Sequence, residues 1–303
     1  MAISRVSLTE TGPEFSRLAY GFWRLAEWDM DTSEVLERIH LCLEHGVTTF
    51  DHADIYGDYT CETIFGRALQ EDPFLRDHME LVTKCGIKLI SPNRPDHRVQ
   101  HYDTSTEHII RSAENSLKNL HTDHIDLLLI HRPDPLMNAD EVAAAFEALK
   151  KDGKVLHFGV SNFTNHQFKL LQSRLDFSLV TNQVELSVMH FDVLHDGTID
   201  YCQQLRIAPM AWSPFGGGAL FTSDSAQARR LQKTLQDIGA EKGGRSPDQV
   251  ALAWIFAHPA KIVPIIGTGK KDRLLSALES VSIELTREDW FRIWSASTGT
   301  DVP

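Results

Sequence analysis

Asp51, His52, Asp54 and Tyr56 follow closely on one short apolar segment, which ends at Phe50. A tyrosine hydroxyl keeps its proton at neutral pH because its ordinary pKa is about 10. A neighbouring ammonium group stabilises the phenolate and lowers that pKa, so that the phenol becomes a usable acid. Such a phenol can protonate a carbonyl oxygen while a hydride source reduces the carbonyl carbon, which makes Tyr56 a candidate proton donor.

A lysine and a histidine can complete this acid–base set, because Lys84 and His131 each end another apolar segment. A partly buried ammonium group needs a carboxylate to remain charged, and Asp51 can supply it. We therefore expect Lys84 and Asp51 to tune Tyr56. Each residue alone also has a structural interpretation, as a turn carboxylate, a surface lysine or a core histidine. Only the combination of these residues indicates an acid–base catalytic site.

The secondary structure that must position these side chains is predicted by an alternation of apolar and amphipathic segments. Strands are expected at 17–21, 48–51, 80–84, 125–131, 157–161, 180–184, 207–212 and 262–267, and helices at 33–45, 61–70, 105–120, 139–152, 165–173, 198–205, 247–257 and 270–280. Eight such alternations predict an α/β protein with parallel strands joined by helical crossovers. The Gly-x-Gly-x-x-Gly motif of an open dinucleotide-binding sheet is absent from the sequence, which favours a closed (β/α)8 barrel.

Polar side chains stand at the ends of most of the expected strands. In a barrel of this kind the carboxyl ends of the strands and the following loops build the active site. A polar group at the end of an apolar strand is costly unless it is paired or used. Besides Asp51, Lys84 and His131, these positions hold Ser161, Asn162, Gln183, Trp212, Ser213, Gly267 and Thr268.

The charge, the apolar stretches and the cysteine spacing of the sequence exclude several classes of protein. The net charge of −12 argues against a general nucleic-acid or anionic-membrane surface. The chain shows no stretch of about 18 apolar residues and no apolar signal segment at its start. Its four cysteines lack paired spacing, which indicates thiols in a reducing compartment. We expect a cytoplasmic protein with one domain over residues 1–303, and no metal, because His-Glu-x-x-His does not occur.

Seven segments together resemble the aldo-keto reductase superfamily, over nearly the whole chain. They are FDHADIYGDYTCETIFGRAL, LVTKCG, HIDLLLIHRPD, GKVLHFGVSNF, VTNQVELS, MAWSPFGGG and PIIGTGKKDRL, which occur in the family's order at compatible spacings. Two further segments, GPEFSRLAYGFWRL and WFRIWSAS, are most similar to the bacterial YdhF-type branch. The long polar segment 87–105 departs from the family pattern, and substrate specificity depends on loops of this kind.

The resemblance implies a TIM barrel closed at the bottom by an N-terminal β-hairpin, which binds a nicotinamide cofactor without a Rossmann fold. It gives Asp51, Tyr56, Lys84 and His131 the positions of a catalytic tetrad, with His131 orienting the substrate carbonyl. The cofactor-binding positions are Trp23, Ser161, Asn162, Gln183, Trp212, Ser213, Pro214, Phe215, Gly216, Gly218, Gly267, Thr268, Gly269, Lys270 and Arg273. Phe22 is expected to line the site as well, whereas His52 should point elsewhere and Asp54 should shape the loop.

The expected cofactor is NADPH. Residues 267–269 can expose backbone N–H groups at the start of a helix, which favours binding of an anion. Lys270 and Arg273 lie three residues apart, whereas Lys271 should point away. In the family, basic and hydroxyl residues of this segment bind the 2′-phosphate of the cofactor.

The expected activity is reduction of a small aldehyde or ketone by hydride transfer, in a protein that is monomeric like most of the family. Two alternatives stay open. One is a regulatory module that keeps the tetrad but turns over little substrate. The other is a lyase or isomerase that uses Lys84 as a Schiff-base amine. The sequence does not identify the physiological substrate.

Overall fold

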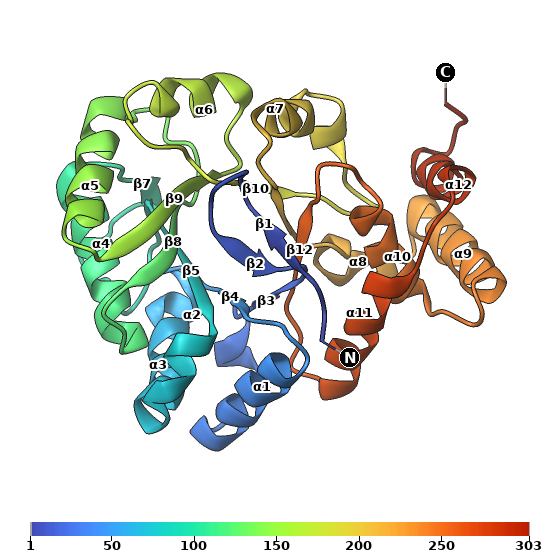
Figure 1. Ribbon diagram of the computed structural model, residues 1–303, viewed down its shortest axis with the longest axis horizontal. Helices are drawn as coiled ribbons and strands as arrows, with labels where there is room; N and C mark the ends of the chain where they lie inside the picture. The colour runs from blue at the N-terminus through green and yellow to red at the C-terminus, as the bar shows by residue number, and fades with distance from the viewer. Residues whose placement is uncertain (1, 303) are drawn as a thin grey trace.

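Eight short strands surround a common axis in the computed structural model, which describes residues 2–302 (Figure 1). They are β3 (Ala19–Gly21), β4 (Thr49–Asp51), β5 (Glu80–Cys85), β8 (Ile125–Ile130), β9 (Val155–Ser161), β10 (Asn182–Glu185), β11 (Met210–Trp212) and β12 (Val263–Ile266). All neighbours pair in parallel, and the order β10-β11-β12-β3-β4-β5-β8-β9 closes on itself. The predicted (β/α)8 barrel is therefore confirmed, with strand ends that differ by a few residues.

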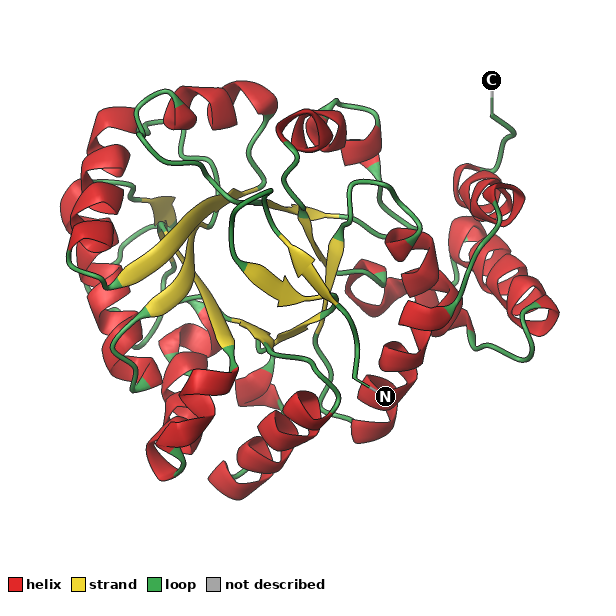
Figure 2. Ribbon diagram, in the orientation of Figure 1, coloured by secondary structure: helices red, strands yellow, loops and turns green. Residues whose placement is uncertain are grey.

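The eight expected helices form the outer layer of the barrel (Figure 2). They are α1 (Thr32–Glu44), α3 (Cys61–Glu71), α4 (Thr106–Leu120), α5 (Ala139–Lys151), α6 (Asn165–Gln172), α7 (Thr198–Leu205), α10 (Pro247–Phe256) and α11 (Lys271–Glu279). Local signals fix their starts: Asp31 and Glu34 form a capping box on α1, and Pro247 occupies the first position of α10. The strands β4, β8 and β12 behind this layer are buried along nearly their whole length, as strands covered on both faces should be.

An N-terminal hairpin closes one end of the barrel. Its strands β1 (Arg5–Ser7) and β2 (Glu14–Ser16) are antiparallel, and Figures 1 and 2 show them across the barrel opening. Val6 and Phe15 are buried against Leu127 and Met210 inside the barrel. Burial of this apolar cluster leaves the opposite end of the barrel for a site.

Several elements were not expected from the sequence. They are β6 (Ile87–Lys88) and β7 (His101–Tyr102), the helices α2 (Tyr56–Tyr59), α8 (Ala219–Thr222), α9 (Ala226–Glu241) and α12 (Arg287–Thr298), and the 3₁₀ turns η1 (Leu25–Glu27), η2 (Pro73–His78), η3 (Asp192–Leu194), η4 (Gly216–Gly218) and η5 (Ser280–Ser282). Helices α9 and α12 pack together outside the barrel, where Arg292 binds Glu241 at 2.7 and 2.8 Å. No helix within residues 2–302 combines the length and apolarity that a membrane span requires.

A buried arginine joins α1 to the loop between β12 and α11. The guanidinium group of Arg38 donates to the carbonyl oxygens of Thr268 and Gly269, at 2.9 Å each, and to the hydroxyl of Tyr20 at 2.7 Å. Arg38 is only 2% exposed, so its charge has little water to replace these partners. The loop at residues 268–269 is thereby held at a fixed place above the barrel.

Replacement of this arginine should therefore be strongly destabilising. Arg38→Leu leaves the Gly269 carbonyl oxygen without a donor and removes one of the two donors to the Thr268 oxygen, which also accepts from the Tyr20 hydroxyl, and we expect it to lower the free energy of unfolding by about 3 kcal/mol. Urea unfolding measures the change. Lys271→Ala is the matched control, because it breaks the exposed Lys271–Glu37 ion pair between α1 and the start of α11 and should change stability by less than about 1 kcal/mol. Equal losses in both variants would contradict the assigned role of Arg38.

Candidate active site

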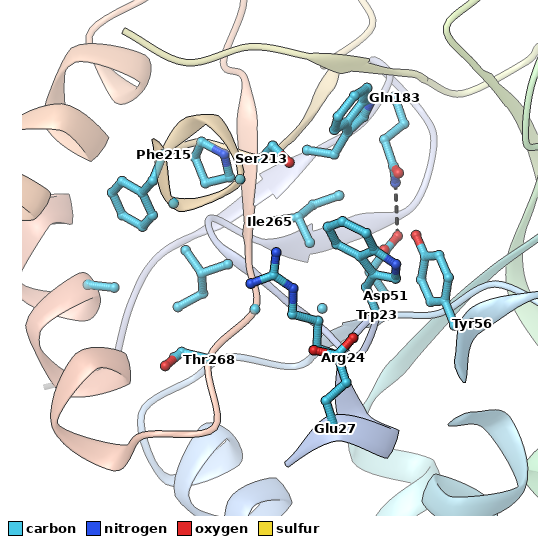
Figure 3. Close-up of a pocket in the computed structure, with 18 of the residues that line it drawn as sticks. Trp23, Arg24, Glu27, Asp51, Tyr56, Gln183, Ser213, Phe215, Ile265 and Thr268 are labelled. Carbon is cyan, nitrogen blue, oxygen red and sulfur yellow. Dashed lines mark hydrogen bonds between the residues drawn. The ribbon is translucent and has the colours of Figure 1, made fainter. Parts of the chain in front are cut away.

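A pocket of about 1010 Å³ opens at the carboxyl ends of the barrel strands. Its wall contains residues at or just after the ends of most strands, namely Gly21, Asp51, His131, Ser161, Gln183, Trp212 and Ile266. Figure 3 shows Asp51, Tyr56 and Gln183 close together on one side of the pocket, with Phe215 and Thr268 on the other. The side chains that the sequence placed at strand ends thus converge on one cavity.

Lys84 is the most heavily bonded residue of the site. Its ammonium Nζ donates to Asp51 Oδ2 at 2.7 Å, to the backbone oxygen of His52 at 2.8 Å and to the Tyr56 hydroxyl at 3.1 Å. Lys84 is 1% exposed and lies behind the pocket wall rather than in it. All three donors of the ammonium group are used, so this amine is not available for a Schiff base.

The backbone after β4 carries Tyr56 back over the strand ends. The N–H groups of His52 and Asp54 donate to the carbonyl oxygens of Val82 and Lys84 at 2.8 and 3.0 Å, which ties this segment to β5. Gly57 then takes a positive φ of 57°, and a Cβ there would lie 2.6 Å from the sulfur of Cys61. A glycine is therefore required directly after Tyr56.

Burial dominates the acid–base properties of these groups. It raises the pKa of Tyr56, and the opposing effect of Lys84 is smaller. Burial also opposes the charge on Lys84, but Asp51 and Tyr56 together raise its pKa. His131 has a pKa well below its usual value, because burial disfavours its charge and Lys84 repels it. At neutral pH the site therefore holds a phenol, an ammonium ion and a neutral imidazole.

A chain of polar groups crosses the pocket between β9, β10 and β11. Ser161 Oγ donates to the Gln183 backbone oxygen at 2.9 Å and accepts from the Asn162 amide at 2.8 Å. The Trp212 indole N–H donates to Asn162 Oδ1 at 3.0 Å, which fixes the plane of the indole ring. The Gln183 amide donates to Asp51 Oδ1 at 2.9 Å, so this chain reaches the tetrad.

Most of the expected cofactor positions line the pocket. Besides those above, its wall includes Trp23, which lies beside Tyr56, and also Ser213, Pro214, Phe215, Gly218, Gly267, Thr268 and Arg273. Gly217 and Gly218 have positive φ values, and a Cβ on either would meet no atom within 4 Å, so their backbone faces open space. This is the geometry that lets a backbone approach a phosphate closely.

Four expected residues do not line this wall. Besides Lys84, they are Gly216, which faces Met189, and Gly269, which lies against the ring of Trp28. The fourth is Lys270, whose extended backbone places it before the first residue of α11, so it does not share a helix face with Arg273. As expected, Lys271 points away, toward Glu37.

Phe22 and Trp23 are neighbours in the sequence but lie in different environments. Phe22 was expected to line the site, but it is fully buried, and its ring stacks on His52 at 4.9 Å between centroids. His52 points into the core, as expected, and burial lowers its pKa to about 3. Trp23 does line the pocket and is 53% exposed. The strand ends at Gly21, and the turn that follows, in which the Leu25 N–H donates to the Phe22 carbonyl oxygen at 3.0 Å, separates Trp23 from Phe22.

The pocket wall also includes residues that the sequence did not single out. Arg132 follows His131, and Arg24 and Glu27 come from the segment around η1 (Figure 3). Arg132 stands directly beside an expected tetrad residue, which is a signal that could have found it. The η1 residues carry no comparable signal, because neither lies at a strand end.

Comparison with known proteins identifies the family. The sequence profile of the Aldo/keto reductase family matches residues 17–297. This chain belongs to the aldo/keto reductase family. It is an NAD(P)H-dependent oxidoreductase, and the similarity to the YdhF-type branch is confirmed. The chain is 52% identical to both the uncharacterized oxidoreductase YcsN of Bacillus subtilis and the oxidoreductase YdhF of Escherichia coli, over 99% of this chain and 100% of each relative.

Two other kinds of relative extend this comparison. A 6-dehydroglucose reductase of Agrobacterium fabrum is 45% identical over 99% of this chain and 100% of its own. Among solved structures, the thermostable aldo-keto reductase Tm1743, in complex with the inhibitor epalrestat, matches with a TM-score of 0.81 at 27% identity, covering 97% of this chain and 100% of that one. An aldo/keto reductase from Klebsiella pneumoniae, in complex with NADP and acetate, has the same fold (TM-score 0.77, 23% identity, 96% and 94% coverage).

Behind the tetrad, this aldo/keto reductase holds two further buried carboxyl groups. Asp54 Oδ2 accepts from Ser112 Oγ at 2.6 Å, which connects the loop after β4 to α4. Glu62 Oε1 accepts from Thr83 Oγ1 at 2.7 Å. Burial raises the pKa of both groups, that of Asp54 to about 8, and the charge of Glu62 adds to the shift at Asp54. Asp54 thus shapes the loop as a largely neutral acid at pH 7.

This pKa makes the stability of the reductase depend on pH. The pKa of Asp54 exceeds the unfolded value of about 3.9, so its contribution is greatest at low pH and is lost as the pH rises through about 8. Asp54→Asn removes this titration, and its stability relative to wild type should rise by about 1–2 kcal/mol between pH 6 and 8. Urea unfolding across this range measures the difference.

Asp58→Asn is the matched control, because it removes an exposed carboxylate from the same loop. Its stability relative to wild type should stay constant with pH. If the Asp54→Asn difference is equally constant, Asp54 does not titrate in this range.

Proposed function

We propose that this reductase converts aldehydes or ketones to alcohols with NADPH, and that Tyr56 donates the proton. The observation that carries the proposal is the position of the Lys84 ammonium group, which bonds both Asp51 and the Tyr56 hydroxyl at the base of the pocket. In this proposal the chain acts as one domain over residues 1–303 and as a monomer.

The protein's own groups support a defined path for the proton. Tyr56 is protonated at neutral pH, because burial raises its pKa. When the carbonyl oxygen takes that proton, the resulting phenolate lies 3.1 Å from the Lys84 ammonium group, which stabilises its charge. His131 is neutral and so has one N–H to donate toward the same oxygen. The rings of Tyr56 and His131 face each other edge-on, 5.9 Å apart, so both can reach one carbonyl oxygen.

The shape and donor set of the pocket fit a nicotinamide dinucleotide. The cofactor, when bound, supplies the hydride that reduces the carbonyl carbon. Trp212 offers a flat ring face of fixed orientation, and Gln183 Oε1 has no hydrogen-bond partner among residues 2–302. Gly217 and Gly218 can border the pyrophosphate. A volume of about 1010 Å³ exceeds that of ordinary small-ligand sites, which leaves room for a substrate beside the cofactor.

Substrate selection is assigned to the entrance of this pocket. Ile87 and Leu89, from the long polar segment 87–105, line the wall, and the Tyr59 hydroxyl accepts from the Leu89 N–H at 2.8 Å. One relative is named a 6-dehydroglucose reductase, so an aldehyde derived from a sugar belongs in any substrate panel for this enzyme.

Loss of the Tyr56 hydroxyl tests the proton donor. Tyr56→Phe should lower kcat by about 10²–10⁴ while the affinity for NADPH stays within a few-fold, because only the hydroxyl is removed. Absorbance of NADPH with a panel of aldehydes measures turnover, and a fluorescence titration measures cofactor binding. Tyr201→Phe, which removes a phenol hydroxyl on α7 outside the pocket wall, should retain wild-type turnover. If Tyr56→Phe keeps more than about a tenth of the wild-type rate, Tyr56 is not the donor.

Arg273 tests the choice of NADPH. It lines the far end of the pocket, is exposed, and has no ion-pair partner among residues 2–302, so it is available for a 2′-phosphate. A charge-assisted hydrogen bond of about 1.5–3 kcal/mol corresponds to a preference of roughly ten- to a hundredfold, and solvent screening favours the lower value. Arg273→Ala should therefore reduce the ratio of kcat/KM for NADPH over NADH by about tenfold. Lys271→Ala, the control on the same helix, should leave this ratio unchanged, and equal wild-type values for both cofactors would refute the assignment.

A further inference from the structure

Arg132 is a half-buried guanidinium group with no bonding partner. It lines the pocket directly after His131, and it makes no hydrogen bond or ion pair with any residue between 2 and 302. The nearest acid along the chain is engaged elsewhere, because the Asp134 carboxylate accepts from Thr104 Oγ1 and from the Leu136 N–H, at 2.8 Å each. Within residues 2–302, the Arg132 guanidinium group packs against one aromatic ring, that of Trp212, whose centroid lies 5.2 Å from the guanidinium carbon.

Two buried arginines of this protein, Arg38 and Arg76, do have bonding partners for their charge. The Arg38 guanidinium group bonds two carbonyl oxygens and a hydroxyl, and that of Arg76 bonds Asp126 at 2.6 Å and further backbone oxygens. A shielded charge without a partner costs free energy, which a ligand of opposite charge would recover. Because Arg38 and Arg76 have such partners, the lack of one at Arg132 indicates that its partner is a ligand.

The position of Arg132 points to the substrate rather than to the distal cofactor groups. Arg132 lines the wall directly after His131, and its guanidinium carbon lies 5.2 Å from the centroid of the Trp212 ring, so it stands at the tetrad end of the pocket, where its charge also acts on Tyr56 and His131. The carboxylate that faces this end of the pocket, Asp51, is already bonded to Lys84 and Gln183. Glu27 and Asp58 also line the pocket, but neither forms an ion pair with Arg132 within residues 2–302.

We propose that Arg132 is a specificity-determining residue that binds a carboxylate on the carbonyl substrate. A guanidinium group presents a planar pair of donors that matches the two oxygens of a carboxylate. The indole of Trp212, held by Asn162, supports the guanidinium group from one side. The enzyme therefore prefers aldehydes or ketones that carry a carboxylate on a short chain. This inference rests on the proposed carbonyl reduction.

A matched pair of substrates tests the inference. 4-Oxobutanoate and butanal present the same aldehyde on chains of similar length, and only the first ends in a carboxylate. Wild type should have the higher kcat/KM for 4-oxobutanoate. Arg132→Gln should lower the ratio of the two kcat/KM values by tenfold or more, mainly through KM for the anion, because a charge-assisted hydrogen bond is lost. Arg132→Lys keeps the charge but not the fork, and should retain part of the preference.

Arg287→Gln is the control variant. It removes the same charge from an exposed arginine on α12, which packs outside the barrel and does not line the pocket. Its substrate ratio should match that of wild type. Glyceraldehyde, which is neutral and hydroxylated, forms a third arm. If Arg132→Gln leaves the substrate ratio unchanged, or lowers kcat/KM equally for 4-oxobutanoate, butanal and glyceraldehyde, carboxylate recognition by Arg132 is refuted.

A binding measurement separates this inference from the proposed function. Calorimetry with butanoate, an unreactive carboxylate, should show at least tenfold weaker binding to Arg132→Gln than to wild type, each saturated with NADP⁺. If wild type reduces none of the three aldehydes but butanoate binding still depends on Arg132, the substrate assignment stands without the reductase activity. If turnover is normal and butanoate binds both proteins equally, carbonyl reduction stands and the role of Arg132 is refuted.

Discussion

A buried ion pair, Lys84 with Asp51, is the constraint on which the rest of the site depends. Both residues are at most 3% exposed, and a buried charge is tolerated only when its partner and its remaining hydrogen bonds are in place. The pairing of β4 with β5 supplies this, since Asp51 stands beside Val82 in the register of the two strands. A shift of one residue would turn one of the two side chains to the other face, so the ion pair is compatible with a single register.

The same ion pair holds side chains from distant parts of the chain together in the site. Tyr56 reaches Lys84 because the segment after β4 bonds to the backbone of β5, and Gln183 crosses the barrel mouth from β10 to bond Asp51. The site therefore forms only when the barrel is closed, because β10 and β4 are not neighbours in it. The N-terminal hairpin contributes from the opposite end, where its apolar side chains fill the barrel below these charges.

The features that the sequence predicted correctly are those that depend on short-range patterns. Strand ends, amphipathic helices and capping residues such as Asp31 can be recognised from local spacing, and they were sufficient to predict the barrel and the polar side chains at the strand ends that line the pocket. The inward position of Phe22 was missed, because it depends on contacts with His52 and Phe65 that come from other elements. The sequence also did not predict that Arg132 lacks a hydrogen-bond partner, because this depends on the bonds that Asp134 forms with Thr104 and Leu136. Helices α9 and α12 were missed because they pack outside the strand–helix alternation.

The net upward shift of the Tyr56 pKa changes how its acidity must be understood. Lys84 is close enough to stabilise a phenolate, but burial of the phenol outweighs it, and Asp51 partly cancels its charge. The pair therefore keeps the proton on Tyr56 rather than releasing it to water, which suits a group that must donate to one particular atom. The attraction between the ammonium ion and a phenolate grows where water is excluded, because the local dielectric constant falls. The stabilising effect of Lys84 on the phenolate is thus largest when a substrate fills the pocket, which is when the proton has to move.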